Sequence, residues 1–158
     1  MTTILLVDDN PDVLSATRRQ LEVGGWEVHA VVSPGDPGGY SVALLDWSPH
    51  GPEMLERCRA AGVPVVVYTG NPTAVADGVV VVVKPASTEQ LDLALRRAIE
   101  RQAERIGHEL ADLLELAHEQ DDEQLQALCW SAAEGNIEAL AKARSCVEVL
   151  DVLEECGR

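Results

Sequence analysis

The chain has 158 residues, 46% of them hydrophobic, and a formal net charge of −15. This negative charge argues against a nucleic acid or an anionic membrane surface as the main partner, because both require a basic face on the protein. The sequence shows neither an apolar run of about 18 residues nor a basic leader with a cleavage site, so we expect a cytoplasmic protein.

Aromatic residues and cysteines add little to the chemistry that the sequence predicts. There is no Phe, so the core must consist mainly of Val, Leu, Ile and Ala. The four cysteines are dispersed, without a CxxC pair or a His at metal-ligand spacing. We interpret them as ordinary reduced thiols: Cys58, Cys129, Cys146 and Cys156.

The first hundred residues alternate short hydrophobic runs with turns and helical segments. Runs rich in Val, Leu and Ile predict five β-strands, at residues 3–7, 26–32, 41–47, 63–69 and 78–84. The connections between these runs are too long for hairpins. We therefore expect parallel strands with crossover connections, which form an open α/β sheet.

Helices are predicted in only some of these connections. Asn10 as the N-cap and Pro11 at the first helical position predict a helix that ends at Gly24. A second helix is expected over residues 52–61.

Two further connections have no room for a full helix. Residues 33–40, "SPGDPGGY", are too rich in Gly and Pro, and residues 70–77 leave space for one or two turns. Of five expected helices, the second and fourth are therefore reduced or absent.

From Ser87 onward the sequence is helical almost throughout. Ser87 and Gln90 form a capping box that opens a long helix, expected to reach about residue 119. Within it, apolar residues follow a spacing of four and three that is typical of a coiled-coil seam: Ile99, Ala103, Ile106, Leu110, Leu113 and Ala117.

Two more helices are expected after this one. A second capping box, Asp121 with Gln124, predicts a helix to about residue 134, and a last helix follows over about 137–155. Residues 101–158 contain fourteen acidic and five basic side chains. We therefore expect two domains: an α/β domain at 1–100 and an acidic all-α domain at 101–158 that mediates protein contacts and dimerisation.

Four of the five predicted strands carry polar residues at or just beyond their carboxyl ends, and these ends meet at one edge of a parallel sheet. Three carboxylates at one edge repel one another, which predicts a bound cation, and hard oxygen ligands suit Mg²⁺. A hydroxyl and an ammonium group beside them are what a phosphoryl group on a carboxylate requires. The residues are Asp8 and Asp9, Asp46, Thr69 and Lys84.

The order and spacing of these motifs resemble the receiver domain of bacterial two-component response regulators. The motifs are "DD" at 8–9, "LLDW" ending just after Asp46, "YTG" around Thr69 and "VVKPAS" around Lys84. The resemblance covers about residues 1–100. It implies a flavodoxin-like (CheY-like), doubly wound sheet of five parallel strands.

The resemblance also implies a role for each residue of this set. Asp46 would be the phosphoacceptor, which takes a phosphoryl group from the phosphohistidine of a histidine kinase or phosphotransfer protein. Asp9 would bind Mg²⁺ directly, Asp8 directly or through water, and the backbone carbonyl of Ser48 would complete the protein ligands.

Thr69 and Lys84 would contact the phosphoryl group, and the Lys84–Pro85 peptide bond would be cis. Such a protein is a signalling switch, a phosphoprotein whose chemistry is self-directed, and not a turnover enzyme.

The sequence departs from the pattern of the family in three places. The loop after Asp46 lacks about three residues and carries Pro49 at its third position. Val81 occupies the usual aromatic switch position, three residues before Lys84. The two reduced helices would also leave part of a Val-rich sheet face uncovered.

Two alternatives remain open. One is a phosphorylation-independent pseudo-receiver, an interaction module in which the short loop has disabled the metal site. The other is an aspartyl-phosphate hydrolase of the haloacid dehalogenase type. Such enzymes need an Asp two residues after the nucleophile, where this chain has Ser48.

Overall fold

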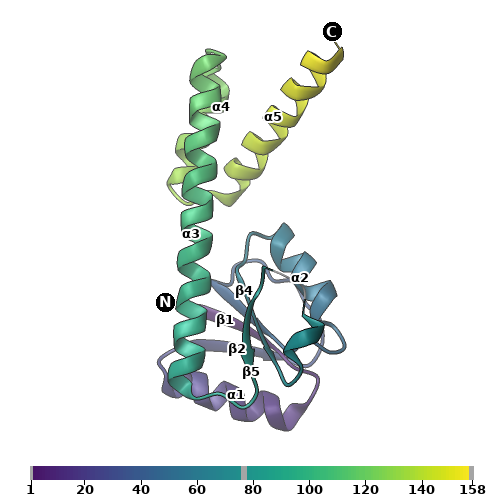
Figure 1. Ribbon diagram of the computed structural model, residues 1–158. Helices are drawn as coiled ribbons and strands as arrows, with labels where there is room; N and C mark the ends of the chain where they lie inside the picture. Colours follow the sequence, from purple (N-terminus) through teal and green to yellow (C-terminus); the bar gives the residue numbers. More distant parts are fainter. Residues whose placement is uncertain (1, 76–77, 157–158) are drawn as a thin grey trace. The chain divides into compact units, whose positions relative to one another are not determined.

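The computed structural model describes residues 2–75 and 78–156 (Figure 1). The chain forms two compact units, Met1–Gln102 and Ala103–Arg158. It passes from one unit to the other within a single helix, α3, which spans Thr88–Glu119. Each unit has its own hydrophobic core and is described separately.

The first unit is built on a sheet of five parallel strands. In spatial order it runs β2-β1-β3-β4-β5, the arrangement of flavodoxin-like folds. This confirms the predicted fold class, and the observed strands are shorter than predicted by up to three residues. They are β1 (Thr3–Val7), β2 (Glu27–Val31), β3 (Val42–Leu45), β4 (Val65–Thr69) and β5 (Val80–Val83).

Two helices cover one face of this sheet. They are α1 (Pro11–Val23) and the first turns of α3. As predicted, α1 begins at Asn10, whose side-chain oxygen accepts the N–H groups of Asp12 and Val13. Side chains from both helices and the sheet form one core, which includes Ile4, Leu6, Leu14, Leu21, Leu44, Val66, Leu91 and Leu95.

Helix α2 (Gly51–Ala60) covers the other face, and Figure 1 shows it beside the sheet. The chain forms no helix between β2 and β3, and between β4 and β5 the described residues form only the 3₁₀ turn Pro72–Ala74. The predicted loss of two helices is therefore confirmed. Its consequence appears at the β5 edge, where Val83 keeps 49% of its surface exposed.

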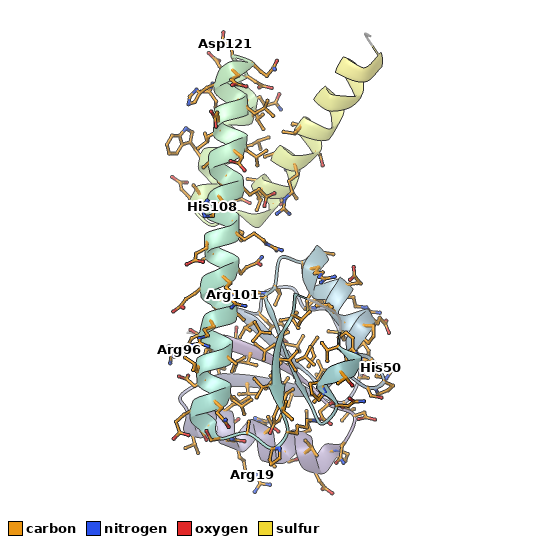
Figure 2. All side chains as sticks on the ribbon, viewed as in Figure 1. Arg19, His50, Arg96, Arg101, His108 and Asp121 are labelled. Atoms are coloured by element: carbon orange, nitrogen blue, oxygen red, sulfur yellow. The ribbon has the colours of Figure 1, made fainter. Side chains whose placement is uncertain are left out.

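The second unit consists of the rest of α3 with α4 (Glu123–Ala133) and α5 (Ile137–Cys156). The N-cap of α4 is one residue later than predicted. The side chain of Asp122 accepts the N–H of Leu125, whereas Asp121 has a left-handed backbone with φ 53°. Asp121 lies in the turn between α3 and α4 (Figure 2) and is not the cap.

The C-terminal part of the predicted seam of α3 packs inside this unit. Leu110, Leu113 and Ala117 are buried against α4 and α5, with Ile106 at the margin. Ile99 instead packs in the core of the first unit, and Ala103 is exposed. The remaining buried side chains are Leu125, Cys129, Ala132, Ala139, Leu140 and Ala143. The repeat thus forms an antiparallel helical core within one chain.

Within the described residues, none of the helices combines the length and the hydropathy needed to cross a membrane.

Candidate functional site

Four strand ends bring the predicted residues to the same edge of the sheet. Asp8 and Asp9 follow β1, Asp46 follows β3, Thr69 ends β4 and Lys84 follows β5. Two backbone hydrogen bonds continue the sheet into this edge. The N–H of Asp46 donates to the carbonyl of Val7 at 2.8 Å, and the N–H of Lys84 donates to that of Thr69 at 2.9 Å.

The three carboxylates form a cluster. One oxygen from each of Asp8, Asp9 and Asp46 lies within 4.8 Å of the others. Their environments differ: Asp8 is 4% exposed, Asp46 is half-buried and Asp9 faces solvent. The most accessible ligand is therefore Asp9.

Lys84 compensates part of this negative charge. Its Nζ lies 2.7 Å from Oδ2 of Asp8 and 3.0 Å from Oδ1 of Asp46. Burial alone would lower the pKa of Lys84, but the hydrogen bonds and charges of the two carboxylates outweigh that effect and raise the pKa. The ammonium group therefore remains charged throughout the physiological pH range.

Asp8 is held at both oxygens. Oδ1 accepts the backbone N–H of Asn10 at 2.9 Å, and Oδ2 accepts from Lys84. A carboxylate that already accepts two hydrogen bonds is well oriented but less free to approach an ion closely. Asp9 is the better candidate for direct coordination, with Asp8 acting directly or through a water.

Thr69 is buried, with 6% of its surface exposed. Its Oγ1 accepts the backbone N–H of Asn71 at 3.2 Å. A hydroxyl group that accepts one hydrogen bond still has its own proton to donate. Thr69 can therefore supply a donor at this edge of the sheet.

The segment after Asp46 forms a short turn that leads directly into α2. Ser48 is exposed, and its peptide bond to Pro49 is cis, as is the expected cis bond from Lys84 to Pro85. His50 stands just before α2 (Figure 2).

Two residues of this turn were not singled out from the sequence. A Cβ on Gly51 would lie 2.7 Å from the indole of Trp47, so Gly51 is needed for close packing of that ring beside Asp46. The Gly in the "DWSPHG" stretch could have indicated this packing, because a Gly often marks a place where another group lies close to the backbone.

Tyr68 is a third residue that sequence reasoning missed. Its hydroxyl oxygen accepts the N–H of Ala86 at 3.2 Å, and its ring lies 5.2 Å from Nζ of Lys84. The contact with the π face adds to the attraction that holds the ammonium group. Tyr68 therefore positions the segment that carries Lys84.

The donor set fits a small divalent cation. Cis and trans oxygen ligands of Mg²⁺ are about 3 and 4 Å apart, since each Mg–O bond is about 2.1 Å. A cluster whose oxygens span up to 4.8 Å needs only a small contraction, or one bridging water, to reach that geometry. Three carboxylates and one ammonium group also leave two negative charges, which a divalent ion would balance.

Among the described residues, no cysteine belongs to a cluster that could hold a metal ion. Cys58 lies on the buried side of α2, and burial raises the pKa of its thiol to about 11. Burial also raises the pKa of Cys129, and Cys146 is a free thiol too. Cys156 lies outside the described side chains. A thiol with a raised pKa is a poor nucleophile and a poor metal ligand.

Comparison with solved structures identifies the fold of the first unit. The receiver domain of a response regulator from Clostridium thermocellum matches with a TM-score of 0.53 and 22% identity, over 65% of this chain and 98% of that domain. The response regulator TrrA of Thermotoga maritima, in complex with Mg²⁺ and BeF, matches with a TM-score of 0.55 and 21% identity, over 62% and 99%.

A third match is the receiver domain of the sensor histidine kinase PA1611 from Pseudomonas aeruginosa PAO1, which has a magnesium ion in its active-site cleft. Its TM-score is 0.53 at 24% identity, over 63% of this chain and 98% of that domain. No protein-family model matches the chain, and no curated protein matches it significantly. The first unit thus has the fold of response-regulator receiver domains, and the helical second unit lies largely outside the matches.

Proposed function

We propose that the chain is a response regulator of a two-component phosphorelay, in which Asp46 accepts a phosphoryl group. The observation that carries this proposal is the shared contact of Lys84 with Asp8 and Asp46, at 2.7 and 3.0 Å, inside a three-carboxylate cluster. A structural ion pair would need one carboxylate, whereas a phosphoacceptor site needs several with a cation beside them.

The proposed reaction is a transfer between two side chains. A carboxylate oxygen of Asp46 forms a bond to the phosphorus of a phosphohistidine on a histidine kinase or phosphotransfer protein. The P–N bond breaks, and its electron pair stays on the imidazole nitrogen of the donor. The product is an acyl phosphate on Asp46.

The site would hold Mg²⁺ through Asp9, Asp46 and the backbone carbonyl of Ser48, with Asp8 bound directly or through water. When bound, the ion would offset the negative charge that accumulates between the carboxylate and the phosphoryl oxygens.

Lys84 and Thr69 would then contact the phosphoryl group. Lys84 already lies against Asp46, so its ammonium group can pair with an oxygen of a phosphoryl group attached there. Thr69 has a free hydroxyl proton and can donate to another oxygen. Both contacts stabilise charge at a position fixed by the ends of the strands.

Phosphorylation by a small donor tests the proposal. The full chain is incubated with acetyl phosphate and Mg²⁺, and its intact mass is measured. We expect one added phosphoryl group on the wild type and on the control Asp36→Asn, an exposed Asp in the β2–β3 connection. Asp46→Asn should remain unmodified.

The opposite result would favour the pseudo-receiver interpretation. If neither acetyl phosphate nor a phosphorylated histidine kinase gives an adduct that depends on Asp46, the chain is an interaction module that works without phosphorylation.

We further propose that the output of the switch is a protein contact made by the second unit, not DNA binding. The negative charge of the second unit supports this proposal, because residues 103–158 contain fourteen acidic and only four basic side chains. Dimerisation through these helices stays a prediction. Dimerisation was inferred from the apolar repeat of α3, but that repeat packs within one chain. A molecular mass of two chains in solution is therefore the observation that would support a dimer.

A further inference from the structure

The outer face of α4 carries an exposed tryptophan. Trp130 has 62% of its surface exposed, although Trp is among the side chains that gain most from burial. The other two tryptophans are better covered: Trp26 is 7% exposed and Trp47 half-buried. The second unit therefore presents a large amphipathic ring to solvent.

Helix geometry places this ring on the solvent side of α4. Leu125, Cys129 and Ala132 define the buried side of α4. With about 100° between successive residues, Trp130 lies about 130° around the helix from the middle of that buried side. The exposed Ala127 and Ala133 lie about 60° to either side of it, and their small side chains leave both flanks of the indole open.

Carboxylates lie along the helix on both sides of the ring. Glu123 is two turns before Trp130 and Glu134 about one turn after it, and both are exposed. Glu134 is also the C-cap of α4, where the partial negative charge of the helix end adds to its own. We call this surface the Trp130 face; it consists of Glu123, Gln126, Ala127, Trp130, Ala133 and Glu134.

We infer that the Trp130 face binds a basic segment of a protein partner, one that presents an arginine or lysine next to an apolar side chain. A guanidinium or ammonium group can stack on the open indole and pair with a flanking carboxylate. Aromatic side chains with open flanks are frequent anchors of protein interfaces.

The charge of the unit narrows the choice of partner. Fourteen acidic against four basic side chains in residues 103–158 would repel a nucleic acid or an anionic membrane surface. The same field would attract a cationic segment and speed its association. This inference rests on the proposed role of the second unit as the protein-contact module, and it specifies the chemistry of that contact.

Selection from a peptide library tests the inference. The full chain is immobilised, and a phage-displayed library of random peptides is selected against it. We expect the bound peptides to be enriched in Arg and Lys close to Leu or aromatic residues. Synthetic copies of them should bind Trp130→Ala about 30-fold more weakly, the loss expected for an interface anchor.

Further variants distinguish the contribution of the indole ring to binding from that of the flanking carboxylates. Glu123→Gln with Glu134→Gln should weaken binding several-fold and reduce its dependence on salt. Two controls should leave binding unchanged: Val23→Ala, a side chain 86% exposed in the first unit, and Glu27→Gln with Glu100→Gln, a pair of exposed carboxylates there. Circular dichroism checks that each variant keeps its helices.

Three results would overturn the inference. They are selected peptides that are neutral or acidic, basic peptides that bind Trp130→Ala as well as the wild type, and self-association of the chain that Trp130→Ala abolishes. The last result would assign the face to a second copy of this chain.

Failure here can be distinguished from failure of the proposed phosphorylation. The selection uses the unphosphorylated chain, and its outcome is compared with that of Asp46→Asn, which keeps the Trp130 face. A chain that takes up phosphate but selects no basic peptides loses only this inference. A chain that selects them but takes up no phosphate loses only the proposed chemistry.

Discussion

The two units of this chain treat polar side chains in opposite ways. Among the described residues, the buried polar side chains are Asp8, Thr17 and Thr69, all in the first unit. The described core of the second unit contains aliphatic side chains and cysteines, and the described charged side chains there lie outside it. An amphipathic ring, Trp130, is exposed there, whereas Trp26 in the first unit is buried.

This difference has a physical consequence. A buried carboxylate is costly unless a cation or a hydrogen bond compensates it, and in the first unit Lys84 supplies that cation to Asp8 and Asp46. An apolar helical core has no such cost and no reactive group. The first unit therefore contains a partly buried cluster of charged groups, whereas the second unit has an apolar core and carries its charges and a large aromatic ring at its surface.

The largest expected effect comes from opening a cavity in one unit at a time. Leu125→Ala in the second unit and Leu44→Ala in the first each truncate a fully buried side chain. We expect each to lower the free energy of unfolding of its own unit by about 3 kcal/mol. Hydrogen exchange followed by mass spectrometry reports each unit separately, and equal loss of protection in both units would show that the chain unfolds as one.

A second prediction concerns the charge balance of the site. Lys84→Ala leaves Asp8 and Asp46 without their cation, and we expect a loss of about 2 kcal/mol in the free energy of unfolding. The three carboxylates then have no ammonium group beside them, so Mg²⁺ should stabilise this variant more than the wild type.

Lys142→Ala is the matched control, because Lys142 forms an exposed pair with Glu138. It should cost less than about 0.5 kcal/mol. Denaturant titrations with and without Mg²⁺ measure both variants. A Lys84→Ala variant as stable as the control would mean that the pairs contribute little to the fold.

The turn after Asp46 offers a smaller effect. Gly51→Ala brings a Cβ to 2.7 Å from the ring of Trp47, so the ring must move or the turn must open. We expect a loss of about 1 kcal/mol, a change in indole fluorescence and slower phosphorylation of Asp46. In Gly70→Ala the new Cβ has no neighbour within 4 Å, so this control should keep the stability, the indole fluorescence and the phosphorylation rate of the wild type.

The smallest expected effect is the dependence of the second unit on pH. Arg144 contacts Glu109 across α3 and α5 and lowers the pKa of that carboxyl group. The pKa of Glu109 is lower in the folded chain than in the unfolded chain. The contribution of this ion pair to stability is therefore present above about pH 4.3 and is lost as the pH falls through the folded pKa.

The pair is partly exposed, so we expect at most about 0.5 kcal/mol. Comparing the wild type with Glu109→Gln at pH 6 and at pH 3 isolates this contribution. A difference that persists unchanged at pH 3 would contradict an ionic origin.

Local sequence signals predicted much of the fold. The Val-rich runs located all five strands, and Asn10 with Pro11 located the start of α1. Capping prediction worked at Ser87, whose hydroxyl accepts the N–H of Gln90 while the Gln90 side chain accepts in return. It failed by one residue at Asp122, because neighbouring aspartates offer equivalent side chains and the backbone of the turn decides between them.

The candidate site was predictable as a set of residues but not as a geometry. Strand ends placed Asp8, Asp46 and Lys84 on one edge, since a parallel sheet allows no other arrangement. The supporting contacts of Tyr68, Trp47 and Gly51 could not be inferred, because they depend on how side chains from separate segments pack.

By itself, the sequence determined the type and order of the elements and the edge at which the polar residues gather, because periodicity and turn chemistry act within a few residues. Only the tertiary structure decided which helices pack against the apolar repeat of α3 and which large side chain remains exposed to solvent. Leu110 and Leu113 pack against α4 and α5 of the same chain, while Trp130 is left in solvent. Both outcomes depend on which helix faces are opposed in space, and the spacing of residues along one helix does not contain that information.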